Sequence, residues 1–174
     1  MQRWIQPCTY QGNSTVADDE IWKSTAWIAH TRLLLDSYER WLGTALISRQ
    51  TSELQQSKEL FEVPFVVLSH GTQADPILNY GNAVALKLWE MDVTTFTQTP
   101  SRYTAEPVQR DDRAAVLART TRDGYVDDYR GIRISGSGKR FQIDRATVWN
   151  LVGPQGTDAG QAATFTDWRW LATS

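Results

Sequence analysis

The order of the helical and extended segments is the feature of this sequence that most constrains its fold. Two helices are predicted first, at about residues 19–42 and 52–63, and two short strands follow near residues 65–70 and 77–80. A helical section then reaches about residue 122, and the last fifty or so residues have the pattern of three strands. Helices between the second and third of five strands favour an antiparallel sheet with a helical group on one face, an α+β architecture.

The first predicted helix carries an apolar stripe with heptad spacing. Its members are Ile21, Trp27, Ile28, Leu34, Leu35, Trp41 and Leu42. Asp18 or Asp19 can cap the start of this helix, and Gly43 can end it. Because tryptophan is bulky for a coiled-coil seam, we expect the stripe to pack on the sheet of its own chain. A helix pair that forms a homodimer is the alternative.

The last two predicted strands are apolar on both faces, so both faces of the sheet need cover. Phe141 and Trp149 lie on one face of their strand, and Val148 lies on the other. The central helices can cover one face and the N-terminal helix the other. We therefore predict a PAS-like five-stranded antiparallel sheet, with residues 1–62 as an N-terminal helical cap and residues 63–174 as the PAS-like domain of one compact unit. The rival is the cone-shaped NTF2-like fold, which would place most helices before all the strands.

Composition excludes several classes of protein. The 174 residues include 18 basic and 20 acidic side chains, a net charge of −2, which gives no general reason to bind nucleic acid or an anionic membrane. No apolar stretch is long enough to cross a bilayer, and the N-terminus lacks the order of a secretion signal. We therefore expect a cytoplasmic protein. Cys8, the only cysteine, cannot form an internal disulfide.

Several long segments agree, in series, with one known family. They are LLLDSYERWLG, FEVPFVVLSHGTQADPILNYGNAVALKLWEMD, TPSRYTAEP, DDYRGIRISGSGKRFQIDRATVWNLV and GQAATF. From about Leu33 to Trp168 the chain resembles the MEKHLA domain family, in its stand-alone bacterial or cyanobacterial branch. The resemblance implies a PAS-like fold and a sensory or interaction role. It brings no established reaction, ligand or catalytic residue.

The motifs that suggest catalysis have simpler structural explanations. Ser69 and His70 are adjacent in a predicted strand, so they point to opposite faces and cannot form a dyad. The same geometry separates Asp127 from Asp128, although Asp128 could form a same-face salt link with Arg130. An NTF2-like enzyme that uses Asp127, Asp128 or His70 as its base is kept as the alternative to a non-enzymatic domain.

The sequence offers little to a metal, a haem or a covalent flavin. The only histidines are His30 and His70, and no paired-cysteine or HExxH spacing occurs. The helix AVALKLWEM has no cysteine for a photoactive flavin, and QRDDRAAVLARTTRD has no histidine for a haem. In that second segment the arginines alternate with aspartates, which is typical of a solvated helix face and not of a nucleic-acid surface.

A dense polar and aromatic set is expected around the cavity of a PAS-like fold. The candidate ligand-binding residues are Asn79, Tyr80, Asn82, Ser101, Arg102, Glu106, Tyr129, Arg133 and Trp149, with Tyr103 beside them. An apolar pocket with a few convergent polar groups is the default small-molecule site. The structural alternatives are that Asn82 only caps its helix and that Trp149 is ordinary core.

The loop PSRYTAEP allows two interpretations of one arginine. Arg102 pairs with Glu106, which is close in sequence, or it faces the cavity as the anchor of a carboxylate ligand. We favour the pair. The leading functional hypothesis is a non-catalytic sensory or interaction domain that binds a small molecule or a protein partner.

Overall fold

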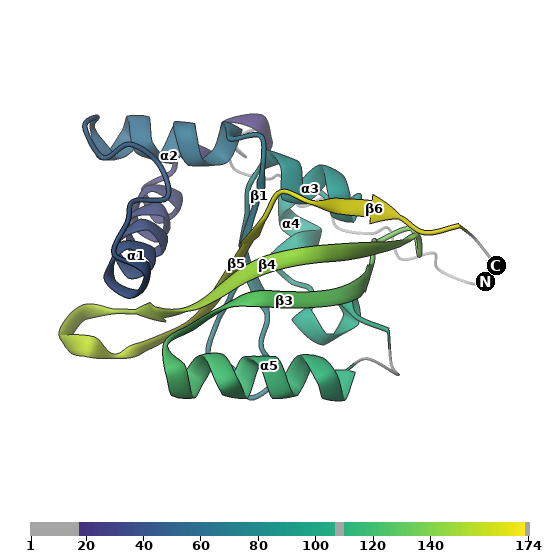
Figure 1. Cartoon of the computed structure of the whole chain (residues 1–174). Helices are drawn as coiled ribbons and strands as arrows, with labels where there is room; N and C mark the ends of the chain where they lie inside the picture. The colour runs from purple at the N-terminus through teal and green to yellow at the C-terminus, as the bar shows by residue number, and fades with distance from the viewer. Residues whose placement is uncertain (1–17, 107–109, 173–174) are drawn as a thin grey trace, which may run out of the picture.

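A computed structural model describes residues 18–106 and 110–172 of the chain (Figure 1). Its N-terminal part consists of η1 (Asp18–Lys23), α1 (Thr25–Leu42) and α2 (Glu53–Glu62). Cys8 lies outside the described residues. So does Gln109, where the sequence placed the start of the last helix.

The first predicted helix is two elements. A short 3-10 segment ends at Lys23, and Ser24 begins α1 by accepting a hydrogen bond from the amide of Trp27. The predicted caps Asp18 and Asp19 were therefore wrong for α1, because the serine hydroxyl takes this role. Gly43 ends the helix as predicted, in the left-handed conformation (φ 71°). Ser52 caps α2.

The strands form one antiparallel sheet. They are β1 (Val66–His70), β2 (Leu78–Gly81), β3 (Tyr125–Ile134), β4 (Arg140–Val152), β5 (Asp158–Phe165) and β6 (Trp168–Trp170). Their order is β2-β1-β5-β4-β3, and β6 also pairs with β4. The first strand thus lies between the second and the fifth, which is the PAS arrangement and excludes the NTF2-like plan. The last predicted strand is broken into β5 and β6, which both run along β4.

The central section contains α3 (Ala83–Trp89), α4 (Val93–Phe96), η2 (Ser101–Thr104) and α5 (Arg110–Asp123), and η4 (Pro154–Gly156) joins β4 to β5. Asn82 accepts a hydrogen bond from the amide of Ala85 and caps α3, as the sequence predicted. At its other end α3 contacts the turn between β3 and β4. Glu90 pairs with Lys139 and accepts hydrogen bonds from Ser135 and Ser137, and these contacts lower the pKa of the Glu90 carboxyl to about 2.

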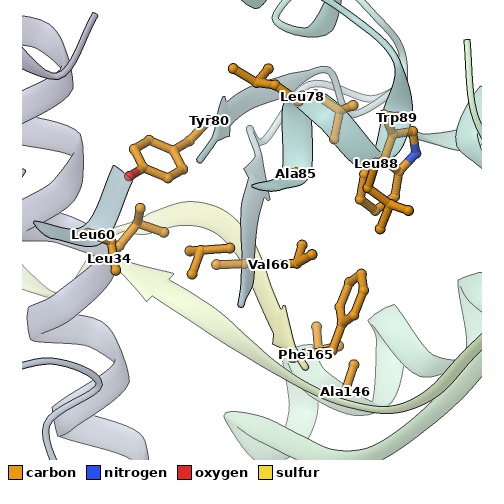
Figure 2. Packing of buried hydrophobic residues seen from close by; sticks show 14 of the residues in the cluster. Leu34, Leu60, Val66, Leu78, Tyr80, Ala85, Leu88, Trp89, Ala146 and Phe165 are labelled. Atoms are coloured by element: carbon orange, nitrogen blue, oxygen red, sulfur yellow. The ribbon is translucent and has the colours of Figure 1, made fainter. Parts of the chain in front are cut away.

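The two faces of the sheet are covered by different helices, as predicted. Figure 1 shows α1 and α5 on different sides of the strands. Leu34 and Leu35 of α1 are buried (0% and 1% exposed), which places the heptad stripe against the sheet of the same chain. In Figure 2 the Tyr80 ring lies on the side of Leu34, away from Trp89. The buried residues on the two faces belong to one hydrophobic cluster. The helices α3, α4 and α5 cover the second face.

Candidate functional site

A cavity lies between the sheet and α5. Its volume is about 60 Å³, and its apolar walls come from β1, β2, β4, β5, α3 and α5. Its polar lining residues are His70, Ser101, Thr104, Arg113, Tyr129, Arg133 and Gln161, and Ser69, whose hydroxyl bonds to His30 and Asn79 on the other face of the sheet, also borders it. On this measure one water needs about 10 to 15 Å³, so the cavity has room for a few small groups.

Arg133 enters the cavity from β3. The residue is 8% exposed, and its guanidinium lies 5.1 Å from the centre of the Tyr129 ring and donates a hydrogen bond to the carbonyl of Ile132 (3.3 Å). Burial lowers its pKa. The Tyr129 hydroxyl passes over Gly131, where a Cβ would lie 2.0 Å from that oxygen, so the glycine allows the tyrosine to reach Arg133.

Arg113 reaches the same cavity from α5. Its Nη2 donates to Oγ of Ser101 over 2.7 Å, which ties α5 to η2. Burial and the nearby charge of Arg133 lower the pKa of Arg113 to about 10. The two guanidinium groups are therefore close enough to repel each other at the cavity.

His70 contributes a free ring nitrogen. Its Nδ1 lies 2.9 Å from the carbonyl of Gly71 and must carry the hydrogen of that bond, because a carbonyl only accepts. Its Nε2 is buried and has no hydrogen-bond partner among the described residues. Burial lowers the pKa of the ring, so the neutral form offers Nε2 as an acceptor.

Three of the nine predicted site residues line this cavity: Ser101, Tyr129 and Arg133. The other six lie elsewhere. Tyr80 stacks on Trp27 with ring centres 4.8 Å apart, and Trp149 contacts Tyr38 edge-on at 5.0 Å, so both face α1.

Asn79 and Asn82 have bonding roles outside the cavity. Asn79 accepts a hydrogen bond from Ser69 (2.6 Å). Asn82 accepts from the amides of Val67 and Ala85 and donates to the carbonyl of Phe65. The capping role weighed for Asn82 is therefore only part of its function, because the side chain also joins α3 to β1.

The predicted pair of Arg102 and Glu106 is wrong. Arg102 is half-exposed and pairs with Asp75 over 3.0 Å, with its guanidinium over the Tyr103 ring at 4.4 Å. Glu106 pairs with Arg140 at the start of β4. Both partners are distant in sequence, so the short spacing between Arg102 and Glu106 was misleading. Neither residue lines the cavity.

The groups proposed for an enzymatic alternative do not meet. Asp127 pairs with Arg145 and Asp128 with Arg119, all on the surface, so the predicted link from Asp128 to Arg130 is also wrong. Ser69 and His70 do point to opposite faces: the Ser69 hydroxyl lies 2.8 Å from Nε2 of His30 on α1. Because Ser69 donates its hydrogen to Asn79, His30 must donate to Ser69 and cannot serve as its base.

The sequence missed Arg113 and underrated His70. Arg113 was assigned to a solvated face because its neighbours alternate in charge. A better signal lies in the spacing: Arg113 precedes Val116, Leu117 and the buried Thr120 by three, four and seven residues, which places it on their inward face. Gln161, which donates to the carbonyl of Leu117 and to Asn150, was missed as well.

The cavity residues do not fit a covalently bound flavin. None of the described residues that line the cavity is a cysteine, and about 60 Å³ cannot hold three fused rings. Within residues 18–106 and 110–172, no group of three or more His, Cys, Asp or Glu side chains is placed to hold a metal ion. No helix formed by these residues is both long and apolar enough to cross a membrane.

Solved structures share this fold at low sequence identity. A PAS domain from Colwellia psychrerythraea superposes with a TM-score of 0.57 and 12% identity, over 67% of this chain and 94% of that one. A light-oxygen-voltage domain studied with a flavin analogue gives 0.52 and 9%, over 72% and 89%. A fungal light-oxygen-voltage photoreceptor domain gives 0.53 and 13%, over 85% and 95%. These likenesses show a fold of the PAS type.

The sequence itself is matched by one family model. No curated protein sequence matches the chain. The model of the MEKHLA domain matches residues 28–170, a stretch that begins within α1 and ends with β6 and so includes the whole sheet and the cavity. The chain therefore belongs to the MEKHLA domain family.

Proposed function

We propose that this PAS-like sensory domain binds a small molecule in the cavity between the sheet and α5, without catalysing a reaction. The observation that carries the proposal is the convergence of buried and half-buried polar groups on an apolar cavity, which is the usual form of a ligand site. Arg113 comes from α5, Arg133 from β3 and His70 from β1, so a ligand there would contact three elements at once.

A binding role is favoured over catalysis by the arrangement of the reactive groups. The cavity holds no carboxylate, its only serine hydroxyl near a cation accepts a hydrogen bond from Arg113, and the single imidazole has no nucleophile beside it among the described residues. A ligand that contacts α5 and the sheet together can change how the helix sits on the strands. That is how we expect occupancy to be transmitted to a partner.

Native mass spectrometry of the purified protein tests this function. We expect a mass above the 19.8 kDa of the chain that is lost on denaturation, or binding of an added small molecule that protects the fold. The same spectrum reports a homodimer, which remains a prediction. A chain that carries nothing and that no compound of a small-molecule screen stabilises would contradict the proposal.

A further inference from the structure

The core cavity carries positive charge without a carboxylate partner. Arg113 and Arg133 both line it, and neither forms a salt bridge among the described residues. All 20 acidic side chains of the sequence belong to residues 18–106 and 110–172, so the segments outside this range add no acidic side chain. A buried charge without a counter-ion is costly, and such groups are normally paired.

The two acidic residues whose charges influence Arg113 and His70 have other partners. Asp75, whose negative charge raises the pKa of Arg113, pairs with Arg102 over 3.0 Å. Asp158, whose negative charge raises the pKa of His70, accepts a hydrogen bond from the amide of Gly160 (3.0 Å). The bonds that Arg133 makes, to the carbonyl of Ile132 and to the Tyr129 side chain, and the bond that Arg113 makes to the hydroxyl of Ser101 all use neutral acceptors. These bonds satisfy only some of the N–H groups of each guanidinium, and none of them supplies a negative charge.

His70 adds a third group that can bind an anion. Its Nε2 has no partner among the described residues and is buried at the same cavity. In its neutral form this atom accepts a hydrogen bond, and beside an anion it gains a proton and donates one. The charged groups that face it are Arg113 and Asp158.

The size and the walls of the cavity limit the anion. About 60 Å³ admits only a small ligand, and Leu78, Val148 and Phe165 present apolar surface to it. A planar carboxylate matches the fork of a guanidinium, and a short hydrocarbon chain matches the walls. Inorganic phosphate has no apolar part to place there.

We propose that the cavity is an anion site formed by Arg113, Arg133 and His70, and that its ligand is a small monocarboxylate with a short apolar chain. This inference rests on the proposed function, because it names the chemistry of the ligand for the same cavity. It predicts, as the proposed function does not, that a charged ligand binds and that its neutral counterpart does not.

Thermal denaturation with matched compounds and variants tests the assignment. Butyrate should raise the melting temperature of the full chain, whereas butyramide, of nearly the same shape but neutral, should not. Arg113→Met and Arg133→Met should each abolish the butyrate shift. Arg119→Met is the matched control on the same helix, because Arg119 pairs with Asp128 on the surface, and it should keep the shift. Without ligand, Arg133→Met should be at least as stable as the native chain, since it removes an unpaired buried charge.

Other outcomes would overturn the assignment in distinguishable ways. An equal shift with butyramide would leave the proposed function standing and refute the anion site. A butyrate shift that survives in both cavity variants would place the anion elsewhere, and a larger shift with inorganic phosphate would refute the carboxylate. If no compound stabilises the protein and both variants melt lower than the native chain, the arginines are structural, and the proposed function fails with the inference. Should Arg133→Met not fold, Arg133→Lys keeps the charge without the fork and should weaken the butyrate shift.

Discussion

Beneath α1 the imidazole, hydroxyl and amide groups of His30, Ser69 and Asn79 bond to one another, whereas beneath α5 two guanidinium groups and His70 line one cavity. The two faces belong to the same sheet, and adjacent strand residues, Ser69 and His70, contribute to opposite ones. Buried polar groups that hydrogen-bond to one another stabilise the fold, whereas charged or titratable groups without such partners at a cavity indicate a binding site. The α1 face also buries neutral atoms without a partner among the described residues, such as Nε1 of Trp149, but these are isolated groups packed among rings. On the α5 face, two cations and an imidazole line one cavity, so the α5 face is the candidate binding face.

The largest expected loss of stability comes from truncating a buried leucine where α1 packs on the sheet. Leu35→Ala should lower the free energy of unfolding by about 2 to 5 kcal/mol, because the side chain is 1% exposed and leaves a cavity when truncated. Urea denaturation at several protein concentrations measures this. A loss below about 0.5 kcal/mol, well under the range for a buried leucine, would contradict the packing of α1 on the sheet.

The second prediction concerns the α1 face: the burial of His30 should make the stability of the fold depend on pH. Burial lowers the pKa of His30 from 6.5 to about 4. Stability is therefore complete above pH 6.5 and falls as the pH drops from 6.5 towards 4, because the unfolded chain takes up a proton that the folded chain excludes. This difference corresponds to about 3 kcal/mol. His30→Gln can still donate to Ser69 and should flatten the fall between these pH values, although the lowered pKa of His70 leaves some of it.

A third test separates a structural amide from a binding one. Asn82→Ala leaves two buried amides without acceptors, those of Val67 and Ala85, and should cost about 1 to 3 kcal/mol. Ser52→Ala is the control, because it removes one exposed cap of α2 and should cost about 1 kcal/mol. Butyrate binding should be unchanged in Asn82→Ala, measured under conditions where the variant is folded. A loss of binding in this variant would return Asn82 to the site.

The smallest effect is expected at Arg102. Its pair with Asp75 is 45% exposed on both sides, so Arg102→Met should change stability by less than about 1 kcal/mol. A larger loss in chemical denaturation would show that this surface pair holds η2 in place. It would also weaken the contrast between Arg102 and the two arginines of the cavity.

Local patterns predicted the fold well and the site poorly. The caps at Ser52, Asn82 and Gly43 and the stripe of α1 depend on neighbours within a few residues, so the sequence displays them directly. The ion pairs depend on contacts across the chain: Arg102 meets Asp75 27 residues away, and Glu106 meets Arg140 34 residues away. No spacing rule indicates such partners.

The position of Arg113 shows where prediction could have gone further. The alternation of charge along α5 describes the helix as a whole, while the burial of Thr120 and the neighbouring Val116 and Leu117 defines one inward face. Counting back along that face would have found Arg113. The volume of the cavity could not be predicted, because it depends on how α5 rests on the strands.

A titration followed by the Nε–H signals of the arginine side chains in NMR tests the central claim most directly. With butyrate, we expect saturable shifts of the Arg113 and Arg133 signals, and no comparable change at Arg102 or Arg119 on the surface or at the indole of Trp27 on the α1 face. Shifts of equal size at the surface arginines, or a cavity pair that does not respond to butyrate, would contradict the assignment of the α5 face as the binding face.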